Sequence, residues 1–370
     1  MLKNIVVICH EPLTNRIKTN FYIDDFIQAG FTVEYWDISQ YMFPGMKLVG
    51  QIEESYIRKL SDLSEIQRRL YLIDIKRTIF IVEAFTNWKS RKFYRLLSDK
   101  KCFIVRIDMY GNTIMNISIW QKLKSIQIER IFKIIKNRLQ ECLLKYYKVL
   151  FNVKDFDMIF SSSILYSDRI PINHPDYERY ILNPVAKKDG YIVFLDVYYP
   201  LHPDIIYMMK NKNVSVVNYQ RSLNTFFDSL EKQCNMPIII AAHPKSEYVG
   251  TEFGNRKIVK GETDSLVEKS NMVILHTSNS VSYCILYNKP FALITNEEYD
   301  KNLYLKSVQK KLSVTLNIPV WNIDKNDMSN FYPCQLSEEE RNKYIYSYLT
   351  SLETSKMLNK DILLGQFAKM

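Results

Sequence analysis

Two short stretches of this chain place residues suited to anion binding at the end of an apolar run. PIIIAAHPK (237–245) ends in His243, Pro244 and Lys245. Pro244 lacks a backbone N–H and biases His243 towards extended geometry, so the imidazole is held where the run stops. A histidine held in this way can donate to a phosphate oxygen, and Lys245 can add a positive charge. A purely structural role for the His-Pro pair is the alternative.

The second stretch, MVILHTSNS (272–280), ends in the polar side chains of Thr277, Ser278, Asn279 and Ser280. The residues that follow have the apolar spacing of a helix, and small polar residues at a helix start leave backbone N–H groups that suit an anion. An ordinary helix cap would use the same residues. Two such run ends in succession, one basic and one rich in hydroxyls, favour a phosphate site.

Acidic residues close other apolar runs and are candidates for moving a proton. Asp108, in RIDMYGN (106–112), is placed to act as a general base, with a strand-end cap as the alternative. Tyr110 lies two residues further on, and His10 and Glu83 close the first and third strands predicted from these runs. We expect Tyr110, His10 and Glu83 on the acceptor side of a site.

The stretch YIVFLDVYYPLHPD (191–204) contributes two further candidates. Asp196 ends its apolar run, and His202 follows in a loop that contains two prolines. We expect both side chains to face the same cleft as His243.

Such residues need a scaffold that brings run ends together, and the chain alternates short β-rich runs with amphipathic stretches. This alternation predicts an α/β fold with parallel strands and crossover helices. In such sheets ligands bind beyond the carboxyl ends of the strands. The runs form two groups of five, 5–9, 32–38, 78–85, 102–108 and 157–163, then 191–196, 214–219, 237–243, 272–277 and 291–295.

The chain of 370 residues fits two domains of roughly 150 residues each. Proline, glycine and charge cluster at 183–190, as in a linker. We therefore predict one Rossmann-like domain over 1–185 and a second over 186–335. A helical tail over 336–370 is expected to pack back on the first domain.

Composition excludes several classes of function. The net charge of +10 with 26 Tyr and 19 Phe is compatible with nucleic-acid binding, but the aromatic residues follow no known RNA- or DNA-binding pattern, so we expect no nucleic-acid partner. Neither G-x-G-x-x-G nor a P-loop occurs. The six cysteines lack metal-site spacing, which predicts reduced thiols, no metal and a cytoplasmic location.

The stretch 122–150 has apolar residues at helical spacing and several Lys and Arg on its other faces. One interpretation is a long surface helix packed on the sheet. The other is a basic amphipathic helix that rests on anionic lipid. No run reaches the roughly 18 apolar residues of a membrane span, so we expect any contact with the inner face of the cytoplasmic membrane to be peripheral.

The stretches AAHPKSEY (241–248) and KGETDSLVEKSNMVILHTSNS (260–280) resemble the paired HP and Ser/Thr motifs of bacterial sialyltransferases and related 3-deoxy-ulosonic acid transferases. This family has the two-domain GT-B fold. The resemblance implies a first domain that binds the acceptor and a second that binds a nucleotide sugar. It implies that His243 and Ser278 to Ser280 hold the phosphate of a CMP-sugar, with Lys245, Thr277, Glu262, Asp196 and His202 on the donor side.

The family also uses an acidic base in a motif of two adjacent acids and a glycine, from which this chain departs, because Asp108 has no adjacent second acid. The sequence thus predicts a metal-independent inverting glycosyltransferase that uses a CMP-sugar, needs no cofactor and acts in bacterial capsule, O-antigen or lipooligosaccharide synthesis. A transferase that uses CDP-glycerol or a UDP-hexose is one alternative. A non-catalytic scaffold that binds a membrane surface or nucleic acid is the other.

Overall fold

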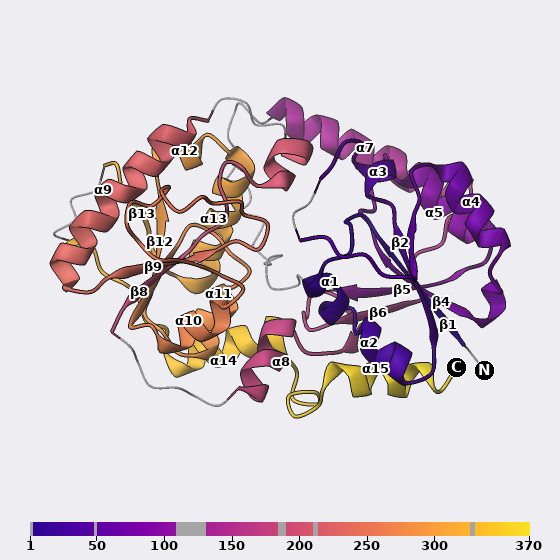
Figure 1. The fold of residues 1–370 in the computed structure, drawn as a ribbon. Helices are drawn as coiled ribbons and strands as arrows, with labels where there is room; N and C mark the ends of the chain where they lie inside the picture. The colour runs from indigo at the N-terminus through magenta and orange to yellow at the C-terminus, as the bar shows by residue number, and fades with distance from the viewer. Residues whose placement is uncertain (1–2, 48–49, 109–130, 184–189, 210–213, 326–329) are drawn as a thin grey trace.

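The computed structural model shows two α/β lobes joined side by side (Figure 1). Each lobe has one parallel sheet, so the molecule has the arrangement of the GT-B fold class. The structure describes residues 3–47, 50–108, 131–183, 190–209, 214–325 and 330–370.

The first lobe is built on a seven-stranded sheet in the order β3-β2-β1-β4-β5-β6-β7. Every strand pair in this sheet is parallel. The chain moves outwards from β1 to β2 and β3, then returns to β4 on the other side of β1, so the strand order reverses between β1 and β4. The strands are β1 (Asn4–Cys9), β2 (Thr32–Asp37), β3 (Ile57–Lys59), β4 (Thr78–Glu83), β5 (Phe103–Asp108), β6 (Met158–Ser161) and β7 (Ile170–Pro171).

The second lobe has a six-stranded parallel sheet in the order β10-β9-β8-β11-β12-β13. Its strand order reverses between β8 and β11. Ligands of open parallel sheets bind at such reversal points, beyond the carboxyl ends of the strands. The strands are β8 (Ile192–Leu195), β9 (Ile238–Ala242), β10 (Ile258–Lys260), β11 (Met272–Leu275), β12 (Phe291–Thr295) and β13 (Val320–Asn322).

Helices cover both sheets, and the two lobes have separate cores. In the first lobe they are α1 (Asn15–Asn20), α2 (Ile23–Gln28), α3 (Ser39–Met42), α4 (Leu63–Tyr71), η1 (Ile75–Arg77), α5 (Arg91–Asp99) and α7 (Ile131–Leu150). In the second lobe and the tail they are η3 (Asp204–Met209), α9 (Val216–Cys234), α10 (Thr263–Lys269), α11 (Val281–Leu286), α12 (Glu297–Asp300), α13 (Leu303–Leu316), α14 (Glu338–Tyr344), η5 (Ile345–Leu349) and α15 (Asn359–Phe367). Helix α8 (Pro175–Leu182) follows the last strand of the first lobe and packs on α10 and α11 of the second.

The central strands are buried on both faces because alternate residues of each strand point to opposite sides of the sheet. In β1, Ile5 and Val7 join the core on one side, while Val6 and Ile8 join the core on the other. All four are buried. This explains why these runs are continuously apolar in the sequence.

The C-terminal tail returns from the second lobe to the first (Figure 1). Ile362, Leu363 and Phe367 of α15 lie in the core beside β1. The Phe367 ring packs against Phe26 and Phe160, at 5.7 Å and 5.8 Å between centroids. The tail therefore ties the two lobes together.

One predicted strand is wrong. Residues 214–219 enter helix α9, whose first N–H groups are capped by Ser215, since its hydroxyl accepts from the Asn218 backbone. The β-branched residues suggested a strand, but Tyr219, Leu223, Phe226 and Leu230 recur at helical spacing and are buried. The short edge strands β3, β7, β10 and β13 escaped prediction, because two- and three-residue runs give no clear periodicity.

Candidate active site

Three loops meet at the carboxyl edge of the second lobe. His243 follows β9, Asp196 follows β8, and the segment His276 to Ser280 follows β11. The sequence suggested that the two polar run ends belong to neighbouring strands, but β8 lies between β9 and β11. The two ends are thus separated by two strand spacings, about 10 Å, with Asp196 between them.

The His243 imidazole is held in one tautomer. Its Nδ1 accepts the backbone N–H of Lys245 at 3.1 Å, so the ring proton is on Nε2, which can donate to a ligand. Burial lowers the pKa of His243 well below its usual range, and the nearby His202 and Lys245 act in the same direction. The imidazole is therefore neutral at pH 7 and offers a hydrogen bond without a full charge.

Asp196 organises the loops around His243. Its Oδ1 accepts the Tyr198 backbone N–H at 3.0 Å, and its Oδ2 accepts the Tyr248 hydroxyl at 2.8 Å and the His243 backbone N–H at 3.3 Å. Burial raises the pKa of Asp196 to about 6, although these hydrogen bonds lower it. The prediction that Asp196 faces a ligand needs correction, because the buried carboxylate is occupied by the protein and positions His243 instead.

The polar segment after β11 divides into a structural and an accessible part. His276 is fully buried, donates from Nδ1 to the Ile294 carbonyl at 2.6 Å and stacks on Tyr299 at 4.2 Å. Thr277 is also buried, and its hydroxyl shares a hydrogen bond with the Tyr299 hydroxyl at 2.7 Å. These contacts hold the start of the His276 to Ser280 segment against the core of the second lobe.

The next three residues, Ser278, Asn279 and Ser280, are half-buried. The Ser278 hydroxyl accepts the Ser280 backbone N–H at 3.2 Å, and α11 is only six residues long. The predicted contribution of a helix start is therefore small, since part of its N–H capacity is used locally. The accessible groups here are the side chains of these three residues.

The carboxyl edge of the first lobe is acidic. Glu83 ends β4 and Asp108 ends β5, and Glu11 lies two residues beyond β1. Burial raises the pKa of Glu83 to about 7, although the Arg106 guanidinium opposes the shift, and the charges of Asp108 and Glu11 add to it. A carboxylate with this pKa can accept a proton at neutral pH and release it again.

The Asp108 carboxylate is buried and accepts a hydrogen bond from a side chain of the neighbouring strand. It is 3% exposed, and its Oδ2 accepts the Ser161 hydroxyl from the next strand at 2.8 Å. The neighbouring Arg106 keeps a buried Nε without a hydrogen-bond acceptor among the described residues. This pattern is compatible both with the predicted base and with a strand-end cap.

Other predicted residues are distributed around these two edges. His10 donates from Nδ1 to the Glu83 carbonyl at 2.7 Å and packs on Phe85 at 4.6 Å, so it stands beside Glu83. The His202 ring contacts the His243 ring edge-on at 4.5 Å. Glu262 is exposed before α10, beyond the outer strand β10. Tyr110 lies outside the described residues.

An ion pair between Lys245 and Glu11 joins the two edges. Lys245 Nζ lies 2.6 Å from Glu11 Oε1, and both side chains are largely buried, at 16% and 19% exposure. Lys245 follows β9 in the second lobe and Glu11 follows β1 in the first. The carboxyl ends of β9 and β1 therefore meet at this contact, with His243 just before Lys245 on one side and the acidic edge of the first lobe on the other.

Glu11 and Tyr248 are functional candidates that the sequence interpretation missed. Glu11 directly follows His10 in CHEP, so the same strand-end argument could have included it. Tyr248 ends the quoted AAHPKSEY motif, but nothing in the sequence shows that its hydroxyl reaches Asp196. Within the described residues, no group of three His, Cys, Asp or Glu side chains is placed to hold a metal ion.

No protein-family model matches the chain. No curated protein sequence matches it either. Similar folds do occur among solved structures. One is Phytolacca americana UGT2 complexed with UDP-2fluoro-glucose and pterostilbene, at 10% identity and a TM-score of 0.49, with 99% of each chain covered.

Two other solved structures illustrate the range of similar proteins. The wall teichoic acid polymerase TagF has 10% identity and a TM-score of 0.45, with 99% of this chain and 87% of that chain covered. The UDP-GlcNAc 2-epimerase from Neisseria meningitidis has 10% identity and a TM-score of 0.43, with both chains fully covered. Likenesses this distant do not select a reaction, which has to be argued from the residues.

Proposed function

We propose that this protein is an inverting, metal-independent glycosyltransferase that transfers a sialic-acid-like 3-deoxy-ulosonic acid from a CMP-sugar to a glycan acceptor of the bacterial surface. The observation that supports this most is the pair of facing strand edges, joined by the contact between Lys245 and Glu11. One edge offers neutral hydrogen-bond donors for a phosphate. The other offers a carboxylate whose pKa suits proton transfer.

The donor would sit on the edge of the second lobe. His243 Nε2–H and the hydroxyls of Ser278 and Ser280 would donate to the phosphate oxygens of CMP, as the motif resemblance implies. Asp196 would hold His243 in place through the contacts described above. Such preorganised donors stabilise the charge that develops on the leaving phosphate, and losing one typically costs on the order of 100-fold in rate.

The acceptor would lie against the acidic edge. Its hydroxyl oxygen attacks the anomeric carbon from the face opposite the CMP group, while the bond between that carbon and the phosphate oxygen breaks. The hydroxyl proton passes to a carboxylate, and CMP leaves with the electron pair. The products are the inverted glycoside, CMP and the protonated base.

Two carboxylates compete for the role of base. Asp108 is the candidate predicted from the sequence. It is buried, and its carboxylate accepts a hydrogen bond from the Ser161 hydroxyl. Glu83 has a pKa of about 7 caused mainly by burial, which matches the requirement of a general base near neutral pH. We assign proton transfer to Glu83 and give Asp108 a supporting role, because its negative charge helps to raise the pKa of Glu83.

The proposal is tested by incubating the protein with a panel of CMP-sugars and glycan acceptors, and following CMP release and product mass by mass spectrometry. We expect product with a CMP-ulosonic acid, undiminished by EDTA. His243→Ala should lower the rate about 100-fold. A scaffold without catalytic activity would release no CMP with any donor, and EDTA-sensitive turnover would contradict the proposed mechanism.

The donor alternatives differ in charge. A UDP-hexose leaves as UDP, and CDP-glycerol carries a diphosphate of which CMP is the leaving part, so both donors bring more negative charge than a CMP-sugar to the cations near His243. Calorimetry with CMP, CDP-glycerol and UDP separates these cases. Tighter binding of CMP supports the proposal, whereas a preference for UDP would exclude a sialyltransferase-like donor site.

A further inference from the structure

Helix α7 carries a stripe of apolar side chains that are exposed in the described part of the chain. Exposure of its members ranges from 50% for Leu143 to 82% for Val149. At 3.6 residues per turn these side chains lie within one face of the helix. The stripe consists of Ile135, Leu139, Leu143, Tyr146, Val149 and Leu150. Exposure on this scale along one helix is unusual, because single exposed apolar residues are common but contiguous ones mark interaction sites.

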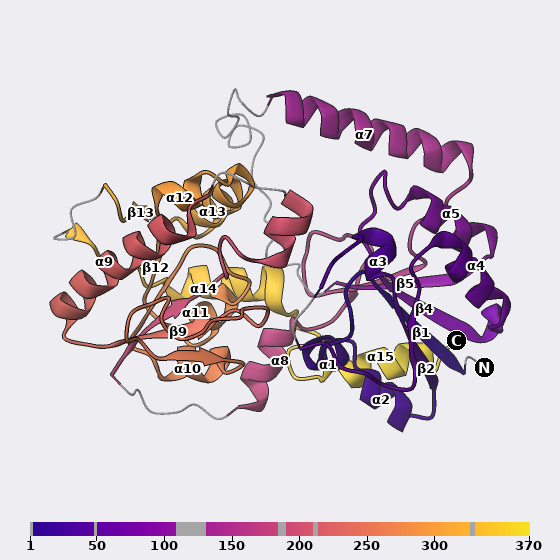
Figure 2. The ribbon, with the colours of Figure 1, turned by 45° about the horizontal axis from the view of Figure 1, so that its top comes forward.

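The stripe points away from the body because α7 is held by its opposite face. Tyr147 packs edge-on against Trp88 at 6.0 Å, and Phe151, just after the helix, packs under the Arg95 guanidinium at 3.9 Å. Both rings join the core near α5. Figure 2 shows α7 running along the outside of the first lobe. The prediction that the apolar face of 122–150 packs on the sheet is therefore wrong for the described part, 135–150.

Positive charges border the stripe on both sides. Lys136 lies along one border, and Arg138 and Lys145 lie along the other, by helical geometry. Arg138 also pairs with Glu141 at 3.2 Å, on an exposed surface where such a pair is weak. An apolar stripe between rows of basic residues is typical of helices that lie in the interface of an anionic membrane.

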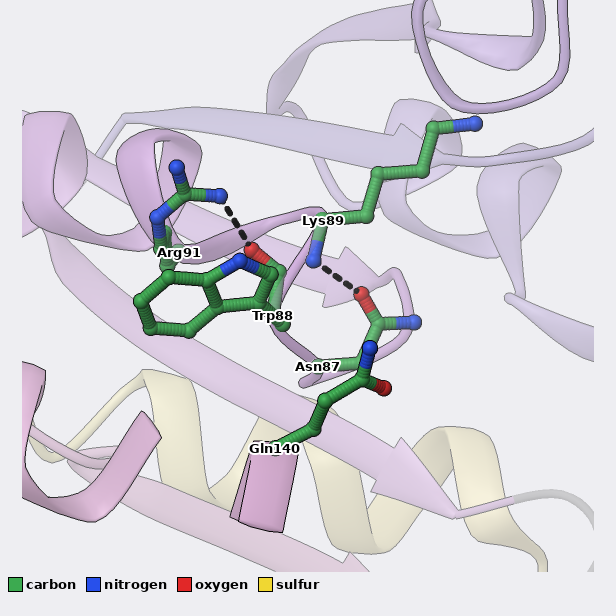
Figure 3. Close-up of a pocket in the computed structure, with 5 residues that line it drawn as sticks. All are labelled: Asn87, Trp88, Lys89, Arg91 and Gln140. Carbon is green, nitrogen blue, oxygen red and sulfur yellow. Dashed lines mark hydrogen bonds between the residues drawn. The ribbon is translucent and has the colours of Figure 1, made fainter. Parts of the chain in front are cut away.

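A hollow of about 460 Å³ adjoins the Lys136 border of the stripe and lies between α7 and the loop after β4. Its lining is Asn87, Trp88, Lys89, Arg91 and Gln140 (Figure 3). The Arg91 guanidinium lies over the Trp88 ring at 4.1 Å, and Gln140 comes from α7 itself. Tryptophan together with cationic side chains suits the headgroup layer of a bilayer, where the ring meets both polar and apolar groups.

We infer that α7 and the adjoining hollow form a docking surface for an anionic phospholipid bilayer. The stripe enters the boundary between headgroups and acyl chains, and Lys136, Arg138 and Lys145 meet lipid phosphates. A second copy of this chain fits less well, because two such stripes in contact would bring rows of like charge together. None of the helices in the described part of the chain is long and apolar enough to span a bilayer, so docking is peripheral.

The docking surface is connected to the acidic edge by a short loop. Glu83 ends β4, and Trp88 and Arg91 of the hollow follow within eight residues. Docking would thus bring the carboxylates towards an acceptor carried by a lipid. This consequence rests on the proposed function, whereas bilayer docking does not depend on it.

The inference is tested by flotation of the full chain with phosphatidylcholine vesicles in about 0.1 M salt. The vesicles are prepared with and without about 30–40% phosphatidylglycerol as the anionic lipid. We expect binding to the anionic vesicles that weakens as salt rises. Leu139→Glu with Leu143→Glu should reduce the partition coefficient at least about tenfold, since each buried leucine contributes substantially. Lys136→Glu with Lys145→Glu should reduce it by a similar factor, because each cation near the surface contributes about fivefold.

Matched controls come from the second lobe. Val217→Glu replaces an apolar residue that is 62% exposed on α9, and Lys232→Glu reverses an exposed charge on the same helix. Both should bind vesicles like the wild type. Equal binding to neutral vesicles, or stripe variants that bind as well as the controls, would overturn the inference. Self-association that is lost in the stripe variants, without vesicle binding, would also overturn it in favour of a second copy. Because vesicle binding needs no turnover, the result is independent of whether the transferase assay succeeds.

Discussion

The two facing strand edges hold polar groups in opposite ways. At the edge of the second lobe, Asp196 accepts three hydrogen bonds, and the His243 tautomer is set by a backbone amide. At the edge of the first lobe, the Glu83 side chain is half-buried, and desolvation raises its pKa while the charge of Arg106 opposes this shift. The first arrangement resists change on binding, which suits recognition of a phosphate. In the second arrangement the ionised form of Glu83 is unfavourable, so the carboxylate readily takes up a proton near neutral pH.

Removing the imidazole should have the largest effect on the recognition edge. His243→Ala is expected to lower kcat/KM about 100-fold, because it deletes a positioned donor to the phosphate. His202→Ala is the comparison variant, since that ring packs edge-on against the His243 ring and is not assigned a phosphate contact in the proposal, so its loss should be much smaller. Initial rates of CMP release measure both. Equal losses in the two variants would show that the edge is not organised around His243.

The role of Glu83 in proton transfer is tested by the pH dependence of activity in the wild type and in variants of Glu83 and Asp108. Activity of the wild type should rise with pH and level off above about 7, as the carboxylate loses its proton. Glu83→Gln should lower kcat about 100-fold and abolish this rise. Asp108→Asn should keep the rise but shift it to lower pH, because a negative charge near Glu83 is removed. A pH rise that survives in Glu83→Gln and disappears in Asp108→Asn would return the role of base to Asp108.

The same pKa shift predicts a change in stability. The folded-state pKa of Glu83 is about 7, above the unfolded value of about 4.3, so the folded protein binds more protons between these values. Wild-type stability should therefore fall as pH rises through this window. Glu83→Gln should be more stable than the wild type at pH 8, by about 1–3 kcal/mol, with the difference fading towards pH 4. Urea denaturation at pH 8 and pH 5 measures it, and a destabilised variant at pH 8 would contradict the electrostatic account.

The contact between the edges should have the smallest effect. Glu11→Gln removes the negative charge that lies 2.6 Å from Lys245 Nζ and so favours a phosphate beside that lysine. CMP affinity should increase about two- to fivefold, in line with the modest strength of ion pairs that keep some contact with solvent. Glu54→Gln is the control, because it removes one of the two carboxylates that pair with Lys18 and leaves the contact between Lys245 and Glu11 intact. Calorimetry measures both, and weaker CMP binding in Glu11→Gln would mean that the pair helps to assemble the site.

Much of the scaffold could be predicted from the sequence. The runs that became β1, β4, β9 and β12 are continuously apolar, which is typical of parallel strands buried on both faces. The run 214–219 misled because β-branched residues at the start of α9 look like a strand when read over six positions. A longer window shows the helical spacing of Tyr219, Leu223, Phe226 and Leu230.

The candidate site could be predicted only in part. A polar residue after an apolar run is visible in the sequence, so His243, Glu83 and Asp108 were all found as strand ends. Their partners were not, because Tyr248 reaches Asp196 and Glu11 reaches Lys245 across long separations in the chain. The same limit applies to α7, since its apolar periodicity is identical whether the face packs on a sheet or remains exposed.

The sequence by itself determined which residues stand at the ends of buried strands, because apolar runs and the polar residues that stop them follow from the chain alone. Only the tertiary structure decided strand order, which put β8 between β9 and β11 and gave Asp196 its positioning role. It also decided the pKa of Glu83, which depends on burial beside Arg106 and Asp108. Burial and distance are properties of the packed chain, since they come from segments that meet only after folding.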